Sequence, residues 1–233
     1  MVGTRWVAIN TRLLAGLIAV ICIIFAVYRG AGSFLAGICI SPEELFAAAL
    51  ENTLNSNSCS FSMRVKLGDA VISDVQGKRV APDSVHITGT MQDMPVEFIH
   101  TGNKTYIKGY WSESWSILED NKMAVAELFV TEFNPLGNFN FKDVPAIKAL
   151  KSEEINGKKL KLLELRPIVQ NSLMELNYDD FIYRVWIDPQ EQVIRKARIE
   201  ARGKHGKKNK LEISLELWDF NKQFKIKPPT VPH

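Results

Sequence analysis

The stretch Tyr183–Ala201, YRVWIDPQEQVIRKARIEA, decides how this chain folds. Its centre holds Asp188 and Pro189, which suit the start of a turn because proline fixes its own φ and has no N–H to donate. Before the turn, every second residue has an apolar or aromatic side chain: Tyr183, Val185 and Ile187. A period of two is typical of a half-buried antiparallel strand, so the stretch predicts two strands joined by a tight turn.

The second half of this stretch is less regular. Val193, Ala197 and Ile199 share one face, but Arg195 falls among them, which suggests that this strand lies near a rim or edge. A third strand is predicted at Leu211–Leu217, where leucine and isoleucine alternate with glutamate and serine. The three strands form a meander with one apolar face. The sequence leaves open whether that face covers a filled core or a lipid cavity.

The charge of the chain is concentrated at its start. The net charge is +3, and residues 1–40 supply all of it through Arg5, Arg12 and Arg29, with no acidic residue. The remaining 26 basic and 26 acidic residues cancel. A general nucleic-acid binder needs a basic surface, so this balance argues against a nucleic-acid partner.

The N-terminal region contains the apolar, uncharged segment Leu13–Tyr28, preceded by Arg5 and Arg12. This pattern predicts a single transmembrane helix with the N-terminus in the cytoplasm and the rest of the chain exported. We therefore expect residues 1–40 to be a cytoplasmic n-region, signal-anchor and linker. A cleaved signal peptide is the alternative, but no Ala-x-Ala cleavage pattern is present. Ile38 directly before Cys39 argues against a lipidation signal, which has a small residue there.

The exported part, residues 41–233, is expected to begin with a helix. Ser41 suits the N-cap, Pro42 the first helical position, and Glu44 completes a capping box. The apolar residues that follow lie on one helical stripe: Leu45, Phe46, Ala49, Leu50 and Leu54. This amphipathic helix must pack its apolar stripe against the sheet that follows.

Short strands joined by turns follow from Ser60, with turns expected near Gly77-Lys78 and at Gly102-Asn103. A helical middle at Met123–Phe133 ends before Pro135, and strands return after a turn at Asn156-Gly157. The residues from Lys225 to His233 are expected to form a closing edge strand and a frayed tail. The whole pattern predicts the α+β class.

Two segments, VWIDPQEQVIRKARIEA and ISLELWDFNKQFKIKPP, resemble the strand-turn-strand pattern of the LolA-like superfamily, which includes LppX–LprG-like lipoprotein carriers. The resemblance implies an incomplete antiparallel β-barrel, or half-barrel, over residues 41–233, with helices on its concave side. It also implies an apolar interior that accommodates acyl chains. The chain departs from the family pattern in pairing a predicted membrane anchor with no lipidation signal, which makes a freely diffusing shuttle a poor fit.

The sequence shows no pattern for catalysis. It lacks the nucleophile-elbow, zinc-protease, phosphate-loop and dinucleotide motifs, and its four histidines are not spaced as metal ligands. Cys22, Cys39 and Cys59 form no metal-binding pattern, while a Cys39–Cys59 disulfide stays open as an alternative to free thiols. We therefore predict neither an enzyme nor a metal or cofactor.

Two groups of residues are candidates for binding. Apolar side chains of the first helix and first meander are expected to line a lipid site, or else to fill a core: Phe46, Leu50, Phe61, Met63, Val65, Ile87, Met91, Phe98, Tyr106, Trp111 and Trp115. The basic hairpin is expected to contact anionic headgroups of the cytoplasmic membrane, or else to be a solvated loop: Lys204, Lys207, Lys208 and Lys210.

Together these features predict non-catalytic binding of a lipid, a lipoprotein acyl chain or another amphiphile at the outer face of the bacterial cytoplasmic membrane. The alternative is a membrane-anchored protein-interaction or sensing module that uses the same fold without taking up lipid. The basic hairpin or the Trp111/Trp115 region would then contact the partner.

Overall fold

The structure, a computed structural model, describes residues 40–109, 112–118, 134–204 and 210–231. Residues from Pro42 onward form one compact unit. The expected membrane anchor at Leu13–Tyr28 and the expected helix at Met123–Phe133 lie outside the described residues. Within those residues, no helix is both long enough and apolar enough to cross a membrane.

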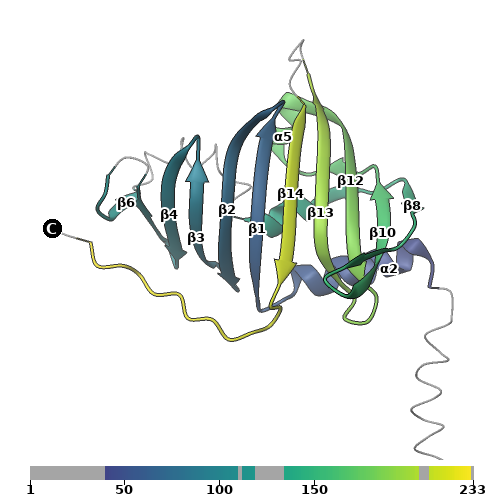
Figure 1. The fold of residues 1–233 in the computed structure, drawn as a ribbon, viewed down its shortest axis with the longest axis horizontal. Helices are drawn as coiled ribbons and strands as arrows, with labels where there is room; N and C mark the ends of the chain where they lie inside the picture. The colour runs from purple at the N-terminus through teal and green to yellow at the C-terminus, as the bar shows by residue number, and fades with distance from the viewer. Residues whose placement is uncertain (1–39, 110–111, 119–133, 205–209, 232–233) are drawn as a thin grey trace, which may run out of the picture. The chain divides into compact units, whose positions relative to one another are not determined.

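A single antiparallel sheet organises the described chain (Figure 1). Its first half contains β1 (Ser58–Leu67), β2 (Ala70–Val80), β3 (Ser84–Met91), β4 (Met94–Thr101), β5 (Lys104–Lys108) and β6 (Ser116–Leu118). Its second half contains β8 (Ile147–Ala149), β10 (Lys158–Leu165), β12 (Tyr178–Asp188), β13 (Val193–Gly203) and β14 (Leu211–Trp218), and β9 (Glu153–Ile155) pairs with β10. The last strand, β14, pairs with the first, β1, and so joins the two halves into an open sheet.

Few helices accompany this sheet. They are α2 (Pro42–Leu54), the 3-10 helix η3 (Pro135–Phe139) and α5 (Ser172–Asn177), while β7 (Phe141–Asp143) and β11 (Ile168–Val169) form a separate small ribbon. The helix predicted after Ser41 is confirmed, and it buries Leu45, Phe46 and Ala49 in the core. Figure 1 shows α2 and α5 behind the β12–β14 half of the curved sheet. The described chain is thus a mostly antiparallel half-barrel with few helices.

The stretch that decides the fold forms β12 and β13, and the predicted inward face of β12 is confirmed. Tyr183, Val185 and Ile187 are all fully buried. The expectation that Arg195 marks a rim strand is wrong, because β13 pairs with β12 on one side and β14 on the other. The register of the β12–β13 pair shifts between Trp186 and Ile187. This shift turns Ile194 inward and leaves Arg195 outward. A β-bulge adds one residue, so the alternation changes phase at this point.

Gly77 does not form the predicted turn. It lies inside β2, opposite Phe61 of β1 and Ile87 of β3. A Cβ atom at this position would lie 2.5 Å from the backbone oxygen of His86 and 2.7 Å from the ring of Phe61. The glycine therefore makes room for a fully buried aromatic ring, a need that no local sequence pattern reveals.

Replacing Gly77 by alanine should lower the free energy of unfolding by about 3 kcal/mol, because overpacking is costly and one of the two contacts is with backbone. Urea denaturation measures this change. Gly102→Ala is the matched control, since its Cβ would meet no atom within 4 Å and only its φ of 61° is unfavourable. A cost for Gly77→Ala no larger than that of the control would contradict this reading.

The chain after β14 also differs from the prediction. No strand is present among the described residues 219–231, so the expected closing edge strand is wrong. Asn221 instead ties the start of this tail to β1: its N–H donates to Ser58 O (2.9 Å), and its Oδ1 accepts from Asn57 N (2.8 Å). Further along, Phe224 lies under the Lys78 ammonium, 5.3 Å from ring centroid to nitrogen.

Candidate functional site: the apolar face of the sheet

The apolar side chains of both sheet halves gather into one buried cluster. Eight of the predicted lining residues belong to it or pack against it: Phe46, Leu50, Phe61, Met63, Val65, Ile87, Met91 and Phe98. The C-terminal meander contributes Tyr183, Val185, Ile199 and Leu215, all fully buried. The structure therefore brings together residues from both ends of the described chain, such as Phe46 and Leu215, on one face.

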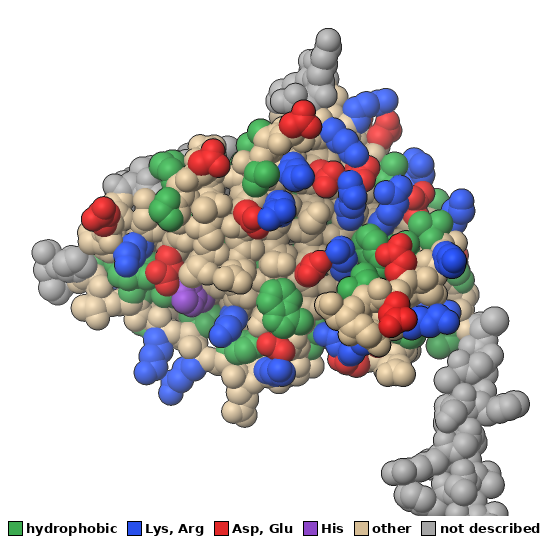
Figure 2. Space-filling model, in the orientation of Figure 1, with side chains coloured by type: hydrophobic (Ala, Val, Ile, Leu, Met, Phe, Trp, Pro, Cys, Tyr) green, Lys and Arg blue, Asp and Glu red, His purple; other side chains and the backbone are tan. Residues whose placement is uncertain are grey.

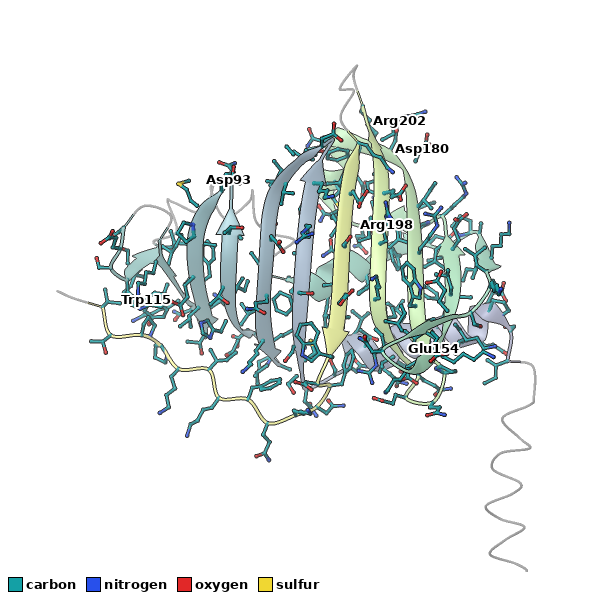
Figure 3. All side chains as sticks on the ribbon, in the orientation of Figure 1. Asp93, Trp115, Glu154, Asp180, Arg198 and Arg202 are labelled. Carbon is teal, nitrogen blue, oxygen red and sulfur yellow. The ribbon has the colours of Figure 1, made fainter. Side chains whose placement is uncertain are left out.

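Two of the predicted lining residues fall elsewhere, and a third is not described. Tyr106 is opposite Ile99 on β4, while Phe98 is opposite Ile107. Tyr106 thus belongs to the other face of the sheet, and Ile107 takes the position that was expected for it. Trp115 is half-buried in the segment before β6, and Figure 3 shows it at the end of the sheet away from β12. Trp111 lies outside the described residues.

A series of aromatic contacts links α2 to the inward face of β12. The rings of Phe46 and Phe141 have centroids 6.2 Å apart, and Phe141 meets Tyr183 edge-on at 5.1 Å. The Tyr183 hydroxyl donates a hydrogen bond to the backbone oxygen of Asn138 at 3.0 Å. Burial raises the pKa of Tyr183 well above its ordinary value, so the hydroxyl keeps its proton and acts as a donor.

Asn138 brings a polar side chain into this apolar region. It is 3% exposed, and its Nδ2 donates to Pro135 O at 3.0 Å and lies 3.8 Å from Met63 Sδ. Its Oδ1 has no hydrogen-bond partner among the described residues. The sequence pattern placed Tyr183 on the apolar face, but it did not identify Asn138 or Phe141 as members of this site. The aromatic richness of residues 139–141 was the only local signal.

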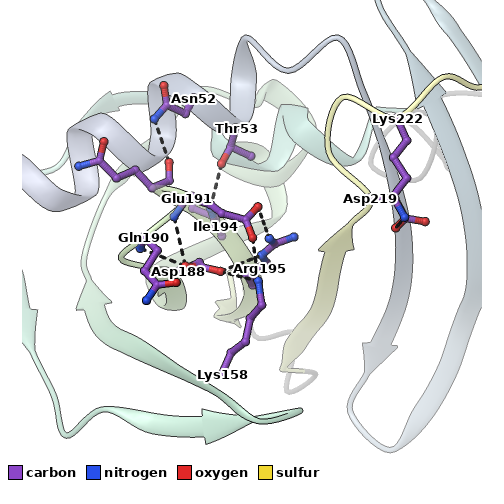
Figure 4. A network of polar contacts seen from close by, with 11 residues as sticks. Asn52, Thr53, Lys158, Asp188, Gln190, Glu191, Ile194, Arg195, Asp219 and Lys222 are labelled. Atoms are coloured by element: carbon purple, nitrogen blue, oxygen red, sulfur yellow. Dashed lines mark hydrogen bonds and ion pairs between the residues drawn. The ribbon is translucent and has the colours of Figure 1, made fainter. Parts of the chain in front are cut away.

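The C-terminal end of α2 is tied to the β12–β13 turn (Figure 4). The Thr53 hydroxyl donates to Ala49 O (2.6 Å) and accepts from Ile194 N (2.9 Å), and Asn52 Nδ2 donates to Gln192 O (3.0 Å). Thr53 is fully buried. These bonds hold the helix in place over the apolar face, because breaking the Thr53 bond leaves the buried N–H of Ile194 unpaired.

Asp188 organises the turn itself (Figure 4). Its Oδ1 accepts from the N–H groups of Gln190 (3.0 Å) and Glu191 (3.2 Å), and its Oδ2 accepts from Lys158 Nζ (3.0 Å). Burial alone would raise the pKa of Asp188. The hydrogen bonds from Lys158 and the two backbone N–H groups outweigh burial and hold the pKa below its ordinary value.

The outer face of β12–β14 carries charges in pairs rather than a basic patch. Figure 2 shows acidic and basic side chains interleaved over this part of the molecule, and Arg198 stands near its centre in Figure 3. Lys196 meets Glu216 at 2.9 Å and Arg198 meets Glu212 at 3.0 Å across β13 and β14. Such exposed pairs contribute only about 0–1 kcal/mol each, but they leave this face close to neutral.

The predicted membrane-contact lysines are only partly described. Lys204 Nζ donates to Glu175 O at 2.6 Å, and Lys210 Nζ donates to Glu200 Oε2 at 2.6 Å. Lys207 and Lys208 lie outside the described residues. Both described lysines thus have protein partners, so membrane contact by this hairpin stays a prediction.

Cys59 is a free, fully buried thiol, and burial raises its pKa to about 11. Cys39, its partner in the disulfide that the sequence left open, lies outside the described residues. Within the ranges that the structure describes, no three His, Cys, Asp or Glu side chains are grouped as metal ligands.

A second feature is an open hollow of about 600 Å³ on the outer face, where β13 and β14 meet the β9–β10 hairpin. Its apolar walls include Leu160, Phe220 and Trp218, whose side chain is among the exposed large hydrophobics. Four cations line it, and each pairs with a carboxylate: Lys158, Arg195, Lys196 and Lys222. Lys158 and Arg195 share Glu191 and also pair with Asp188, which does not line the hollow, so the charges of this amphipathic hollow balance only when Asp188 is counted.

No protein-family model matches this chain, and no curated protein sequence matches it either. Solved structures do. The lipoprotein LppX of Mycobacterium tuberculosis is 19% identical, with a TM-score of 0.54, covering 80% of this chain and 100% of LppX. LprF of Mycobacterium bovis is 14% identical, with a TM-score of 0.53, covering 81% of this chain and 98% of LprF. The predicted resemblance is therefore confirmed at the level of fold, which this chain shares with LppX and LprF.

Proposed function

We propose that this protein binds the acyl chain of a lipid, a lipoprotein or another amphiphile without catalysis, between the apolar face of its sheet and the elements that cover it. It acts in the bacterial envelope, at the outer face of the cytoplasmic membrane. The observation that carries this proposal is the continuous apolar cluster that runs from β4 and β3 through β1 and β14 to β12.

The nature of the buried side chains supports this proposal. The cluster includes Met63, Met91 and Met174, whose unbranched side chains adapt to ligands of different shape. The described helices contact chiefly β13, β12 and β8 rather than the whole sheet. An acyl chain could therefore be accommodated by shifts of flexible side chains without breaking strand pairing. The shared fold with the lipoproteins LppX and LprF is consistent with an envelope role.

The alternative function, a protein-interaction or sensing module, is favoured by one observation. The outer hollow offers a partner the exposed Trp218 together with paired charges, a combination suited to a polypeptide rather than to an acyl chain. In that role the interior would be a permanently filled core, and lipid uptake would play no part.

Uptake of an acyl probe separates the two functions. Residues 41–233 contain the whole compact unit and are the material for this test. We expect saturable binding of a fluorescent fatty acid at about one site per protein, with micromolar affinity, which corresponds to roughly 8 kcal/mol. Trp218→Ser should leave this binding unchanged because Trp218 is on the outer face. A folded protein that takes up no probe would refute lipid binding and leave the interaction role.

A further inference from the structure

The Asn138 carboxamide is a buried polar group that apolar packing does not explain. Asn138 is 3% exposed, and its side-chain nitrogen lies 3.8 Å from Met63 Sδ, while Tyr183 bonds its backbone oxygen. The side-chain nitrogen of Asn138 donates a hydrogen bond to Pro135 O, but the side-chain oxygen has no hydrogen-bond partner among the residues that the structure describes. Leaving a buried acceptor unpaired costs about 1–3 kcal/mol, and native proteins rarely do so without a reason.

The orientation of this carboxamide is fixed by its neighbour. Pro135 offers only a carbonyl oxygen at 3.0 Å, and a carbonyl can only accept. Rotating the carboxamide by 180° would bring two oxygens together, so the nitrogen must face Pro135 and the oxygen must face away. The unpaired atom is thus an acceptor and not a misassigned donor.

The backbone around Asn138 is held firmly. The Asn134 side chain caps η3 by accepting from Gly137 N at 3.1 Å, and Tyr183 donates to the Asn138 carbonyl. By contrast, Met63, which lies beside the carboxamide, has a flexible thioether side chain that can move to admit a ligand. A fixed acceptor beside an adaptable apolar neighbour is the arrangement expected of a recognition point.

We propose that Asn138 Oδ1 accepts a hydrogen bond from a neutral O–H or N–H group that the bound amphiphile carries next to its acyl chain. This inference rests on the proposed function and specifies its ligand class: hydroxyl- or amide-bearing amphiphiles rather than fully esterified or purely hydrocarbon ones. The group is neutral because the two residues in contact with the carboxamide, Pro135 and Met63, offer no charge to pair with a buried ion.

Competition between two matched probes tests this inference. Dodecanol and dodecyl methyl ether share one chain, but only the alcohol can donate a hydrogen bond. On residues 41–233, dodecanol should displace a fluorescent fatty acid at about tenfold lower concentration than the ether. Asn138→Leu keeps the shape of the side chain and removes the acceptor, so the preference for the alcohol should disappear.

Asn171→Ala is the control, because Asn171 also uses its Oδ1, as the cap of α5, where it accepts from Met174 N at 3.1 Å. It should lower stability but keep the preference for the alcohol. Equal potency of the two probes on the wild-type protein would overturn the inference and assign the acceptor to a buried water. The comparison of the two probes on the wild-type protein tests the inference even if Asn138→Leu fails to fold. A preference that survives in Asn138→Leu would overturn it too, whereas absence of all acyl binding would refute the proposed function itself.

Discussion

Replacing Phe98 by alanine should lower the free energy of unfolding by about 3–5 kcal/mol, the range for removing a buried phenyl ring. Phe98 is 1% exposed on β4 and faces the apolar cluster between Ile87 of β3 and Ile107 of β5. Its ring lies in the half of the sheet that α2 and α5 do not chiefly contact. Chemical denaturation with two probes of unfolding measures the loss.

The same variant tests the proposed function, because it enlarges the interior at the site of the missing ring. If acyl chains bind on this face, Phe98→Ala should accept longer or bulkier chains than the wild-type protein does. Ile99→Ala is the matched control: Ile99 is the next residue, is also buried, and faces the opposite side of the sheet beside Tyr106. It should lose stability without changing the preferred chain length. An equal shift in both variants would argue against an acyl site on the apolar face.

The sequence predicted the strands and their inward faces well where a period of two runs without interruption. The inward residues of β12 and the alternation of β14 follow directly from the pattern, because successive side chains of a strand point to opposite faces. The helix after Ser41 was equally clear, since capping box and apolar stripe agree. The pairing of β14 with β1 was not predicted, because no local pattern shows which edges of two meanders meet.

The failures have a common cause, which is that the deciding contact lies far away in sequence. Arg195 looked like a rim residue because the bulge opposite Trp186 changes the phase of β13. Gly77 looked like a turn because its partner, the Phe61 ring, lies sixteen positions earlier. Tyr106 was predicted on the face that Ile107 occupies. A short strand with apolar side chains on both faces does not fix its own register, so the sequence could not show which of the two faces inward.

The polar part of the site could not be predicted at all. Asn138 matters through Pro135, Met63 and Tyr183, and two of those three residues come from remote strands. A lone asparagine in an apolar, irregular stretch carries no local signature of burial. The apolar lining was predictable by residue type, whereas the position of the unpaired Asn138 acceptor depends on tertiary contacts.

Replacing Asp188 by alanine should lower the free energy of unfolding by about 3 kcal/mol, because hydrogen bonds to a charged group are each worth roughly 1.5–3 kcal/mol. The Asp188 side chain is 5% exposed and accepts from two backbone N–H groups and from Lys158. Glu191→Ala is the control. Glu191 also pairs with Lys158, but it is 48% exposed, so its loss should cost no more than about 1 kcal/mol.

The dependence of stability on pH provides a second test of Asp188. Its pKa is lower in the folded than in the unfolded chain, so the stability that it contributes is fully present above the unfolded value, about 4, and is lost as pH falls through the folded value. The wild-type protein should therefore lose stability more steeply below about pH 4 than Asp188→Ala does. Because the Asp188 turn positions Ile194 for its bond to Thr53, acid should loosen α2 as well. If the free energy of unfolding falls equally steeply with pH in both proteins, the Asp188 carboxylate does not stabilise the turn that binds α2.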